Sequence, residues 1–552
     1  MSQPLHVPVL IAGGGPTGLV LAAELSRHGV ASMLAERNEH TTLFPKMDIT
    51  NGASMELLRR LGVDTELRAV GVGAQHSFDV VFAAGLGGPI HGRWRLPSVD
   101  EQRGIIAATA DGSVPGQPWQ RCSQAIFEAM MMNHAHRDPL VDVRQGWRLQ
   151  TCVQAGDLVA AQLADRDGNS VTVHADYLVG CDGASSRVRG ELGIEMDGLK
   201  DFTNFALVHF RSLDLTNLHA LGQFWHLYAS NGSVLIAQNE VDTWTLHLDL
   251  GAQVDDPDPI GDPREFVARA LGRPVVIDEI LASSVWRPNA MLADSYGRDR
   301  ILLAGDAVHT MIPTGGYGMN TGLGDAVNLG WKLAATIQGW GGPALVGSYE
   351  IERRPVAERN RDACVENAMV IVQYRDMVDA QLIDADNGDG QAHRQRVAQF
   401  LATNDAENLS LGIELDVRYD DSPVVVPDGS ATPPWDRRTF VPTVRPGHRA
   451  PNVALGERDT LFDRFGPEFT LVDALDDNGQ SSRLLSEAAR VGMPIRHLTL
   501  TDPALAALYR HRLVLVRPDL HIAWSGTDST DAADVIARAT GARPAVAPTQ
   551  VR

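Results

Sequence analysis

The chain has 552 residues, in which 48 Lys and Arg side chains stand against 69 Asp and Glu, for a formal net charge of −21. Such an acidic excess argues against nucleic acid and anionic membrane surfaces as partners. No apolar stretch approaches the roughly 20 residues that span a bilayer, and no basic leader precedes the first apolar run, so we expect a cytoplasmic protein. The four cysteines form no C-x-x-C pair, so neither a disulfide framework nor a metal site is predicted.

The chain begins with the pattern of a parallel dinucleotide-binding sheet. Residues 7–12 are an apolar run of strand length, residues 17–28 have helical spacing, and residues 31–35 are a second apolar run. The turn between the first strand and the helix has the G-x-G-x-x-G spacing, and its candidate cofactor-binding residues are Gly13, Gly15, Pro16, Thr17 and Gly18. Glycines at these positions allow the tight turn and bring the backbone close to a pyrophosphate at the helix N-terminus.

An acidic residue follows the second strand at the position expected for ribose binding. Glu36 lies 21 residues after Gly15, where a carboxylate accepts hydrogen bonds from the hydroxyls of an adenosine ribose. Arg37 could instead indicate a ribose phosphate, but the adjacent acid weakens that alternative because it would repel the phosphate.

A second motif lies near the middle of the chain. Asp182 and Gly183 directly follow an apolar run, where the aspartate can orient turn N–H groups toward a pyrophosphate. An ordinary strand-to-helix turn would have the same appearance. Arg121 and Gln124 open a helix-like stretch between the two motifs, and they are equally consistent with cofactor contacts and with solvated residues at a helix start.

A third motif follows the apolar run 301–304. Asp306 ends this predicted strand, and a core would not bury such an acid without a partner; a ribityl hydroxyl is the expected one. The loop from Pro313 to Gly318 leads into a helix that begins near Met319 and Asn320, whose positive end would favour the charge of a reduced flavin pyrimidine ring. His309 is expected to be a structural hydrogen-bonding residue. Three such motifs in this order predict one FAD and an FAD-dependent oxygenase.

The remaining segments predict two further layers. Between about 200 and 290 the chain alternates apolar and polar residues, which is typical of a half-buried antiparallel sheet. Candidate substrate-binding residues on it are Trp225, Tyr228, Gln238 and Trp244, although ordinary sheet packing explains each of them equally well. After a long helical region, residues 420–451 have the composition of a linker, and short apolar runs then predict a small α/β domain.

In this order the motifs resemble those of the single-component FAD-dependent aromatic hydroxylases, the group A flavoprotein monooxygenases, most closely the branch of phenol and dichlorophenol hydroxylases. The resemblance implies an α/β fold with a Rossmann-like FAD-binding domain, an inserted antiparallel-sheet substrate domain, and a C-terminal thioredoxin-like domain. That last domain lacks the redox C-x-x-C, which implies a structural or dimer-supporting role and a homodimer. The expected boundaries are 1–80, 100–195 and 290–375 for the FAD-binding domain, 81–99 and 196–289 for the substrate domain, 376–445 for a helical segment and linker, and 446–552 for the thioredoxin-like domain.

The resemblance also supplies a catalytic candidate. Aligning the chain through the Met55-Glu56 helix start places Asp48 where phenol hydroxylase has its active-site aspartate. Just before it, Lys46 stands where relatives usually have an arginine that contacts the flavin; lysine keeps the charge but loses the two-pronged geometry.

The mechanism implied by this resemblance starts with NADH or NADPH, which docks transiently and reduces FAD. Oxygen then forms a C4a-hydroperoxide, and its distal oxygen passes to an electron-rich carbon of a small phenolic substrate. The pKa of Asp48 must therefore be raised by burial, or Asp48 must accept the phenol proton only as oxygen transfers. The alternatives are a Baeyer–Villiger or dearomatising biosynthetic monooxygenase of the same fold, and a flavin NAD(P)H oxidase that oxygenates nothing.

Overall fold

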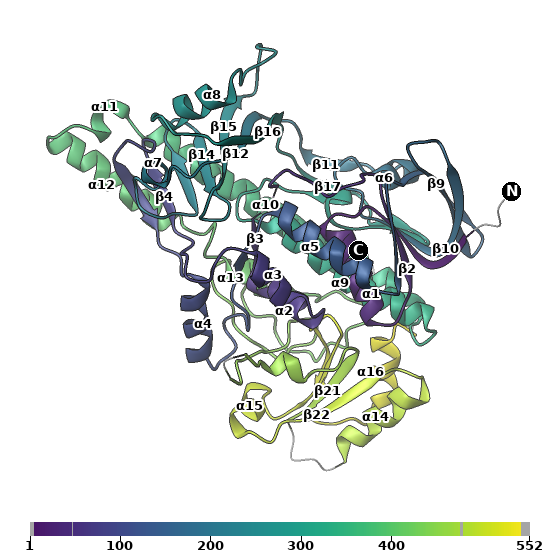
Figure 1. The fold of residues 1–552 in the computed structure, drawn as a ribbon. Coiled ribbons are helices and arrows are strands. Elements are labelled where there is room, and N and C mark those ends of the chain that lie inside the picture. Colours follow the sequence, from purple (N-terminus) through teal and green to yellow (C-terminus); the bar gives the residue numbers. More distant parts are fainter. Residues whose placement is uncertain (1–4, 47, 457, 475–478, 543–552) are drawn as a thin grey trace, which may run out of the picture.

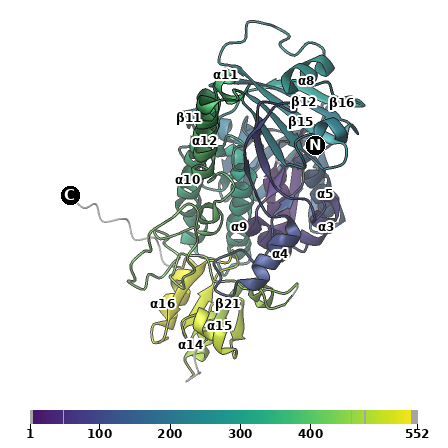
Figure 2. The ribbon, with the colours of Figure 1, turned by 90° about the vertical axis from the view of Figure 1, so that its left-hand side faces the viewer.

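The computed structural model describes residues 5–46, 48–456, 458–474 and 479–542 (Figure 1). It has the α/β architecture expected from the sequence, with a large parallel sheet, a second, mostly antiparallel sheet, and a small C-terminal domain at the opposite end from that second sheet (Figures 1 and 2). Met47 of the Pro45-Lys46-Met47 segment lies outside the described residues. No helix in the described part of the chain combines the length and apolar character needed to cross a bilayer.

The first sheet brings the ends of several distant strands to one edge. Its strands, in spatial order, are β18 (Gly297–Arg298), β19 (Ile301–Leu303), β10 (Ser170–Gly180), β1 (Leu5–Ala12), β2 (Ser32–Glu36) and β7 (Val141–Gln145). All neighbours are parallel except β18 and β19, and the hairpin of β8 (Arg148–Ala155) and β9 (Leu158–Ala164) extends β10. Because β1, β2, β10 and β19 are parallel, their carboxyl ends meet at the same edge, where open α/β sheets bind ligands.

Apolar helix faces cover this sheet. The main ones are α1 (Pro16–Arg27), α5 (Gln124–Arg137), α9 (Tyr317–Ile337) and the long α10 (Pro343–Met377), which lie together in the middle of the molecule (Figure 1). Fully buried Leu19 of α1, Phe127 of α5 and Leu323 of α9 share one apolar core with the strands. Smaller helices on the same body are α2 (Gly52–Arg60), α3 (Asp64–Val70), α4 (Val99–Ala108) and α6 (Arg187–Leu192).

The second sheet has two differently used faces. Its seven strands run in the order β16 (Glu279–Trp286), β12 (Asn204–Arg211), β15 (Thr243–Gly251), β14 (Ser233–Ala237), β13 (His226–Ala229), β4 (Val80–Ala83) and β5 (Ile90–Trp94), all antiparallel except β13 with β4. One face packs with α7 (Leu215–Leu218) and α8 (Pro263–Leu271) around Trp244. The other face carries Trp225 and Tyr228 and packs against α10 and α12 (Gly388–Thr403). This alternation is what the sequence pattern predicts.

Short elements connect these bodies. They are the sheet of β11 (Met196–Leu199), β17 (Ala290–Ala293) and β20 (His309–Thr310), the pair β3 (Ile49–Thr50) and β6 (Gln120–Arg121), the helices α11 (Ala380–Ile383) and α13 (Leu411–Leu415), and the 3-10 turns η1 (Gly305–Ala307) and η2 (Leu461–Arg464). The pair of β3 and β6 places Asp48, just before β3, beside the second sheet.

The C-terminal domain has the arrangement expected for a thioredoxin-like fold. Its strands run in the order β22 (Ile495–Thr499), β21 (Phe469–Asp473), β23 (Leu513–Val516) and β24 (Ile522–Gly526), with only the first pair parallel. The helices α14 (Gln480–Arg490), α15 (Pro503–Leu508) and α16 (Ala532–Ala539) pack on this sheet (Figure 1).

A buried ion network joins this domain to the FAD-binding body. Arg517 donates to Glu352 of α10 at 2.7 Å and to Asp519 at 2.5 Å. Lys332 of α9 donates to the same Glu352 at 2.6 Å. Two cations and two carboxylates are thus enclosed with matched charge, which is the condition under which buried ions are tolerated.

Arg517→Met should destabilise the protein by about 3–5 kcal/mol, because Glu352 and Asp519 would lose a buried counter-charge. Thermal or urea unfolding of the whole chain measures this change. The control is Arg144→Met, since Arg144 pairs with Asp142 on an exposed surface and should cost less than about 1 kcal/mol. Equal stability of the two variants would contradict the structural role of the network.

Candidate active site

The three glycine motifs predicted from the sequence meet at the carboxyl edge of the parallel sheet. A Cβ on Gly13 would lie 2.3 Å from the carbonyl oxygen of Cys181, and a Cβ on Gly305 would lie 2.4 Å from Oγ1 of Thr17. Gly18 packs as tightly on the carbonyl of Gly13. Only glycine permits these approaches, so the first motif is clamped directly between the second and the third.

Gly15 is different, because the fold does not need its missing side chain. A Cβ on Gly15 would meet nothing within 4 Å, and its backbone is extended at φ −77°. It is the N-cap of α1, which has Pro16 in its first turn and no side-chain cap. The open space and the uncapped N–H groups fit the pyrophosphate of a dinucleotide.

The carboxylate of Glu36 faces the same turn. It accepts the N–H of Gly14 at 2.7 Å and the backbone N–H of Asn38 at 2.8 Å. Arg37 points to solvent beside it. Ribose binding by Glu36 stays a prediction, and the position of Glu36 at the end of β2 favours it.

Asp182 shapes the second motif from inside. Its carboxylate accepts the N–H groups of Arg187 and Val188, at 2.7 and 3.1 Å, at the start of α6. Gly183 follows with φ +81°, which favours glycine. Arg189 then donates to the carbonyl of Ala307 at 2.9 Å and so ties this turn to the third motif. The carboxylate of Asp182 therefore already stabilises the turn. A contact between Asp182 and the cofactor stays a prediction.

Asp306 is the acceptor that the third motif offers. Its side chain is exposed, and no group in the described ranges donates a hydrogen bond to it. Dense surroundings raise the pKa of Asp306, and the charges of His309 and Lys46 only partly offset this effect. An exposed carboxylate with no donor in the described ranges, in the turn after β19, fits a ribityl hydroxyl as its partner.

Asp325 of α9 holds this motif in place. Its fully buried carboxylate accepts the N–H of Gly305 at 3.2 Å, pairs with His309 at 2.8 Å, and accepts Nε of Arg353 at 2.8 Å. Burial raises the pKa of Asp325, but Arg353 and His309 outweigh it and keep the pKa below its usual value. His309 thus has the structural partner that the sequence did not reveal.

The other predicted cofactor residues differ in where they point. Lys46 is exposed, and its charge acts on Asp306 and on Glu128. Gln124 donates to Glu128 at 2.6 Å. Arg121 is buried and donates to Glu240 at 2.6 Å and to the carbonyl of Ala237, so its guanidinium faces the second sheet. Cofactor contacts of Arg121 and Gln124 remain predictions.

The loop before α9 completes the cradle. Pro313 is exposed, and Gly316 caps the helix with φ +66° and no side-chain cap. Asn320, in the first turn with Gly318 and Met319, donates to the carbonyl of Ile49 at 3.2 Å and accepts the N–H of Asn51 at 3.1 Å. The uncapped helix start, together with Asp306 and the start of α1, fits the flavin, ribityl and pyrophosphate groups of FAD.

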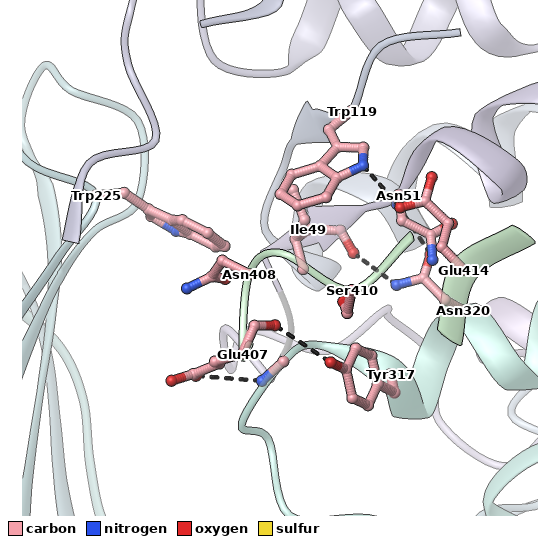
Figure 3. Close-up of a pocket in the computed structure, with 11 residues that line it drawn as sticks. Ile49, Asn51, Trp119, Trp225, Tyr317, Asn320, Glu407, Asn408, Ser410 and Glu414 are labelled. Carbon is pink, nitrogen blue, oxygen red and sulfur yellow. Dashed lines mark hydrogen bonds between the residues drawn. The ribbon is translucent and has the colours of Figure 1, made fainter. Parts of the chain in front are cut away.

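A small pocket adjoins this cradle (Figure 3); its empty volume of about 320 Å³ includes space open to solvent, and the centre of a water-sized sphere can reach about 20 Å³ of it. It lies between the loop before α9, strand β3, and Trp225 just before β13. Its lining residues are Ile49, Asn51, Trp119, Trp225, Gly315, Tyr317, Asn320, Glu407, Asn408, Ser410 and Glu414.

Asp48 is not one of these lining residues, but its carboxylate contacts Trp225, which is. Its carboxylate accepts Nε1–H of Trp225 at 2.6 Å and lies 3.4 Å from Nε2 of His226. Burial raises the pKa of Asp48, but His226, Trp225 and the charge of Arg121 outweigh it, so the pKa lies below its ordinary value. The sequence left two possibilities for Asp48: a pKa raised by burial, or acceptance of the phenol proton only as oxygen transfers. The lowered pKa contradicts the first possibility, so the second remains.

The four predicted substrate residues separate into two groups. Trp225 lines the pocket, and Tyr228 donates to Glu407 at 3.1 Å directly behind it. Trp244 is instead fully buried in the core against α8, with its Nε1–H on the carbonyl of Ser212. Gln238 is buried and bonded to Thr245. Neither lines this pocket, because their side chains lie inside the packed sheet, so the packing interpretation applies to both.

Sequence reasoning missed two pocket-lining residues, Glu407 and Glu414, and His226 beside Asp48. His226 lies within the alternating run that contained Trp225 and Tyr228, and its histidine ring was a signal that could have been used. Glu407 and Glu414 come from the segment predicted as helix and linker, and nothing in their spacing pointed to a site. Burial raises the pKa of both carboxyls, to about 7 for Glu414.

Fold and site together define a flavin-dinucleotide-binding oxidoreductase with an aromatic-lined pocket, and the comparisons with known proteins agree. Residues 6–364 match the model of the FAD binding domain, and residues 443–543 match that of the aromatic-ring hydroxylase C-terminal domain. The FAD-dependent monooxygenase apdD of Emericella nidulans is 41% identical over 97% of this chain and 90% of its own. Aklavinone 12-hydroxylase RdmE of Streptomyces purpurascens is 30% identical over 96% of this chain and 97% of its own.

A solved structure is also similar. The rebeccamycin biosynthetic enzyme RebC with reduced flavin superimposes with a TM-score of 0.86 at 31% identity and covers 98% of this chain and 100% of its own. The chain belongs to the family of FAD-dependent aromatic hydroxylases and is a flavoprotein monooxygenase with FAD as its cofactor.

Gly15→Val should keep the fold and lose FAD. The new side chain enters space that no protein atom fills, yet this is where the pyrophosphate must approach the α1 N-terminus. We expect an FAD dissociation constant at least tenfold higher in a fluorescence titration, with unfolding temperature of the apoprotein within a few degrees of the parent. The control is Gly347→Val, at an exposed glycine of α10 that also has open space. Unchanged FAD affinity of Gly15→Val would contradict the assigned cradle.

Proposed function

We propose that this monooxygenase hydroxylates a phenolic ring carbon of a small aromatic substrate, with NADH or NADPH as transient co-substrate. The observation that carries the proposal is the Asp48 carboxylate, which accepts Nε1–H of Trp225 where that ring lines the pocket. A phenol placed there would lie between the FAD cradle and a hydrogen-bond acceptor.

The cofactor residues divide the binding work. The α1 N-terminus at Gly15 would hold the pyrophosphate, Asp306 the ribityl chain, and the first turn of α9 the flavin ring. When bound, FAD supplies the activation of oxygen with electrons from the nicotinamide. Asn320 joins the α9 turn to strand β3, which keeps the cofactor site and Asp48 in fixed register.

The low pKa of Asp48 decides how it acts. A phenol with a pKa near 10 would lose its proton to a carboxylate near 3.9 only at a cost of roughly 8 kcal/mol, and a lower pKa increases that cost. Asp48 therefore first accepts a hydrogen bond from the substrate hydroxyl and orients the ring. It takes the proton as the ring carbon is attacked and the hydroxyl becomes acidic. His226, 3.4 Å from the carboxylate, is placed to receive that proton.

We further propose a cytoplasmic homodimer. In the described ranges Cys122, Cys152, Cys181 and Cys364 are all buried and unpaired, which suits a reducing compartment. The resemblance of the C-terminal domain to a dimer-supporting thioredoxin-like module supports the dimer.

Asp48→Asn should bind FAD normally and hydroxylate about 100-fold more slowly, because the amide cannot accept the proton. Product analysis with a panel of phenols, beside measurements of NAD(P)H and peroxide, separates lost hydroxylation from continued oxidation of reductant. The control is Asp294→Asn, an exposed aspartate after β17.

The pH dependence follows from the same residue. A lowered pKa keeps Asp48 ionised as the pH falls from 8 to about 5, so its contribution to the rate should persist over that range and disappear only at lower pH.

Unchanged coupled turnover of Asp48→Asn would remove Asp48 from the mechanism. If the products instead carried an oxygen inserted beside the carbonyl of a ketone, the Baeyer–Villiger alternative would be correct and the proposed hydroxylation would be wrong.

A further inference from the structure

Two neighbouring side chains that line the pocket each have a buried polar atom without a hydrogen-bond partner in the described part of the chain. Glu407 and Asn408, in the loop between α12 and α13, are only 5% and 6% exposed. Oε2 of Glu407 and Nδ2 of Asn408 have no hydrogen-bond partner among the described residues. Figure 3 shows both side chains extending to the same side, beneath the Trp225 ring.

The orientation of the Glu407 carboxyl is fixed by its other oxygen. Oε1 accepts the hydroxyl of Tyr228 at 3.1 Å and the N–H of Gly315 at 3.2 Å. Oε2 therefore cannot turn toward the same donors without breaking these bonds. A buried polar atom without a partner is unfavourable, so a ligand that satisfies both free atoms should bind more tightly than one that satisfies neither.

The charge of the lining excludes one class of ligand. Glu407 and Glu414 are its ionisable acids, and none of the eleven lining residues is Lys, Arg or His. Glu414 is already satisfied, since it accepts Nε1–H of Trp119 at 2.9 Å and the N–H of Ala53 at 3.1 Å. A substrate carboxylate would face two buried carboxyls without a lining cation, which is unfavourable in a low-dielectric site.

We propose that this pocket selects uncharged phenols bearing an adjacent donor and acceptor, such as the N–H and C=O of an amide, which Glu407 and Asn408 bind as a pair. The donor of the substrate meets Oε2 of Glu407, and its carbonyl accepts Nδ2–H of Asn408. This inference rests on the proposed function, because it names the substrate class of the same site.

Three matched compounds test the pairing on the FAD-bound enzyme: 3-hydroxybenzamide, its N,N-dimethyl derivative and 3-hydroxybenzoate. Perturbation of the flavin absorbance gives each dissociation constant at pH 7.5. We expect 3-hydroxybenzamide to bind at least tenfold tighter than the other two, because only it is neutral and retains both N–H and C=O. Equal binding of the three, or tighter binding of the benzoate, would overturn the inference.

Variants separate hydrogen bonding from ligand size. Asn408→Ala and Glu407→Gln should each reduce the preference for 3-hydroxybenzamide at least threefold. The control Glu414→Gln should leave it within twofold, because that carboxyl already has its partners. A preference that survives both Asn408→Ala and Glu407→Gln would show that the dimethyl group is rejected by size alone, and the pairing would be wrong.

Product formation is scored separately from binding. Equal binding with hydroxylated products would overturn the substrate class and leave the proposed function in place. If 3-hydroxybenzamide binds most tightly but no phenol gives an oxygenated product, the result would support the pairing and overturn the proposed function.

Discussion

The site depends on one buried carboxylate, Asp325. It is enclosed by the protein, and an ion so placed is stable only when every lone pair has a donor. Its donors are the N–H of Gly305, the ring of His309 and the guanidinium of Arg353. Because these come from the turn after β19, from strand β20 and from α10, their positions are fixed together.

That fixed point determines the shape of the cofactor cradle. With the Gly305 turn held, Thr17 packs against it, and the glycine turn before α1 is pressed onto Cys181. The α1 N-terminus and Asp306 then lie at the same edge of the parallel sheet. The same helix α9 carries Asn320 toward strand β3, so that Asp48 and the pocket are positioned from the same element. The C-terminal domain supports this arrangement from the other side, because Arg517 binds Glu352, the neighbour of Arg353 on α10.

The sequence predicted the parts of this arrangement that local chemistry dictates. Glycine spacing, strand-length apolar runs and the acids at strand ends predicted the parallel sheet, its glycine turns and the FAD cofactor, because each depends on a short segment. The order of these motifs carried the resemblance to the hydroxylase family, and which of their residues contact FAD stays a prediction. Asp48 came from the family resemblance, and its role remains a proposal. Trp244 and Gln238 were placed in the pocket because alternation identifies a strand but does not say which face meets the substrate. The lining residues Glu407 and Asn408 lie in a loop far along the chain, where only tertiary packing brings them to Trp225.

The central claim is that distant turns close around one FAD, and hydrogen exchange of the apoprotein titrated with FAD tests it most directly. Peptides covering residues 13–18, 181–189, 305–309 and 316–321 should gain protection together, with one midpoint and one FAD per chain. Protection confined to a single one of these peptides, or different midpoints among them, would contradict the account.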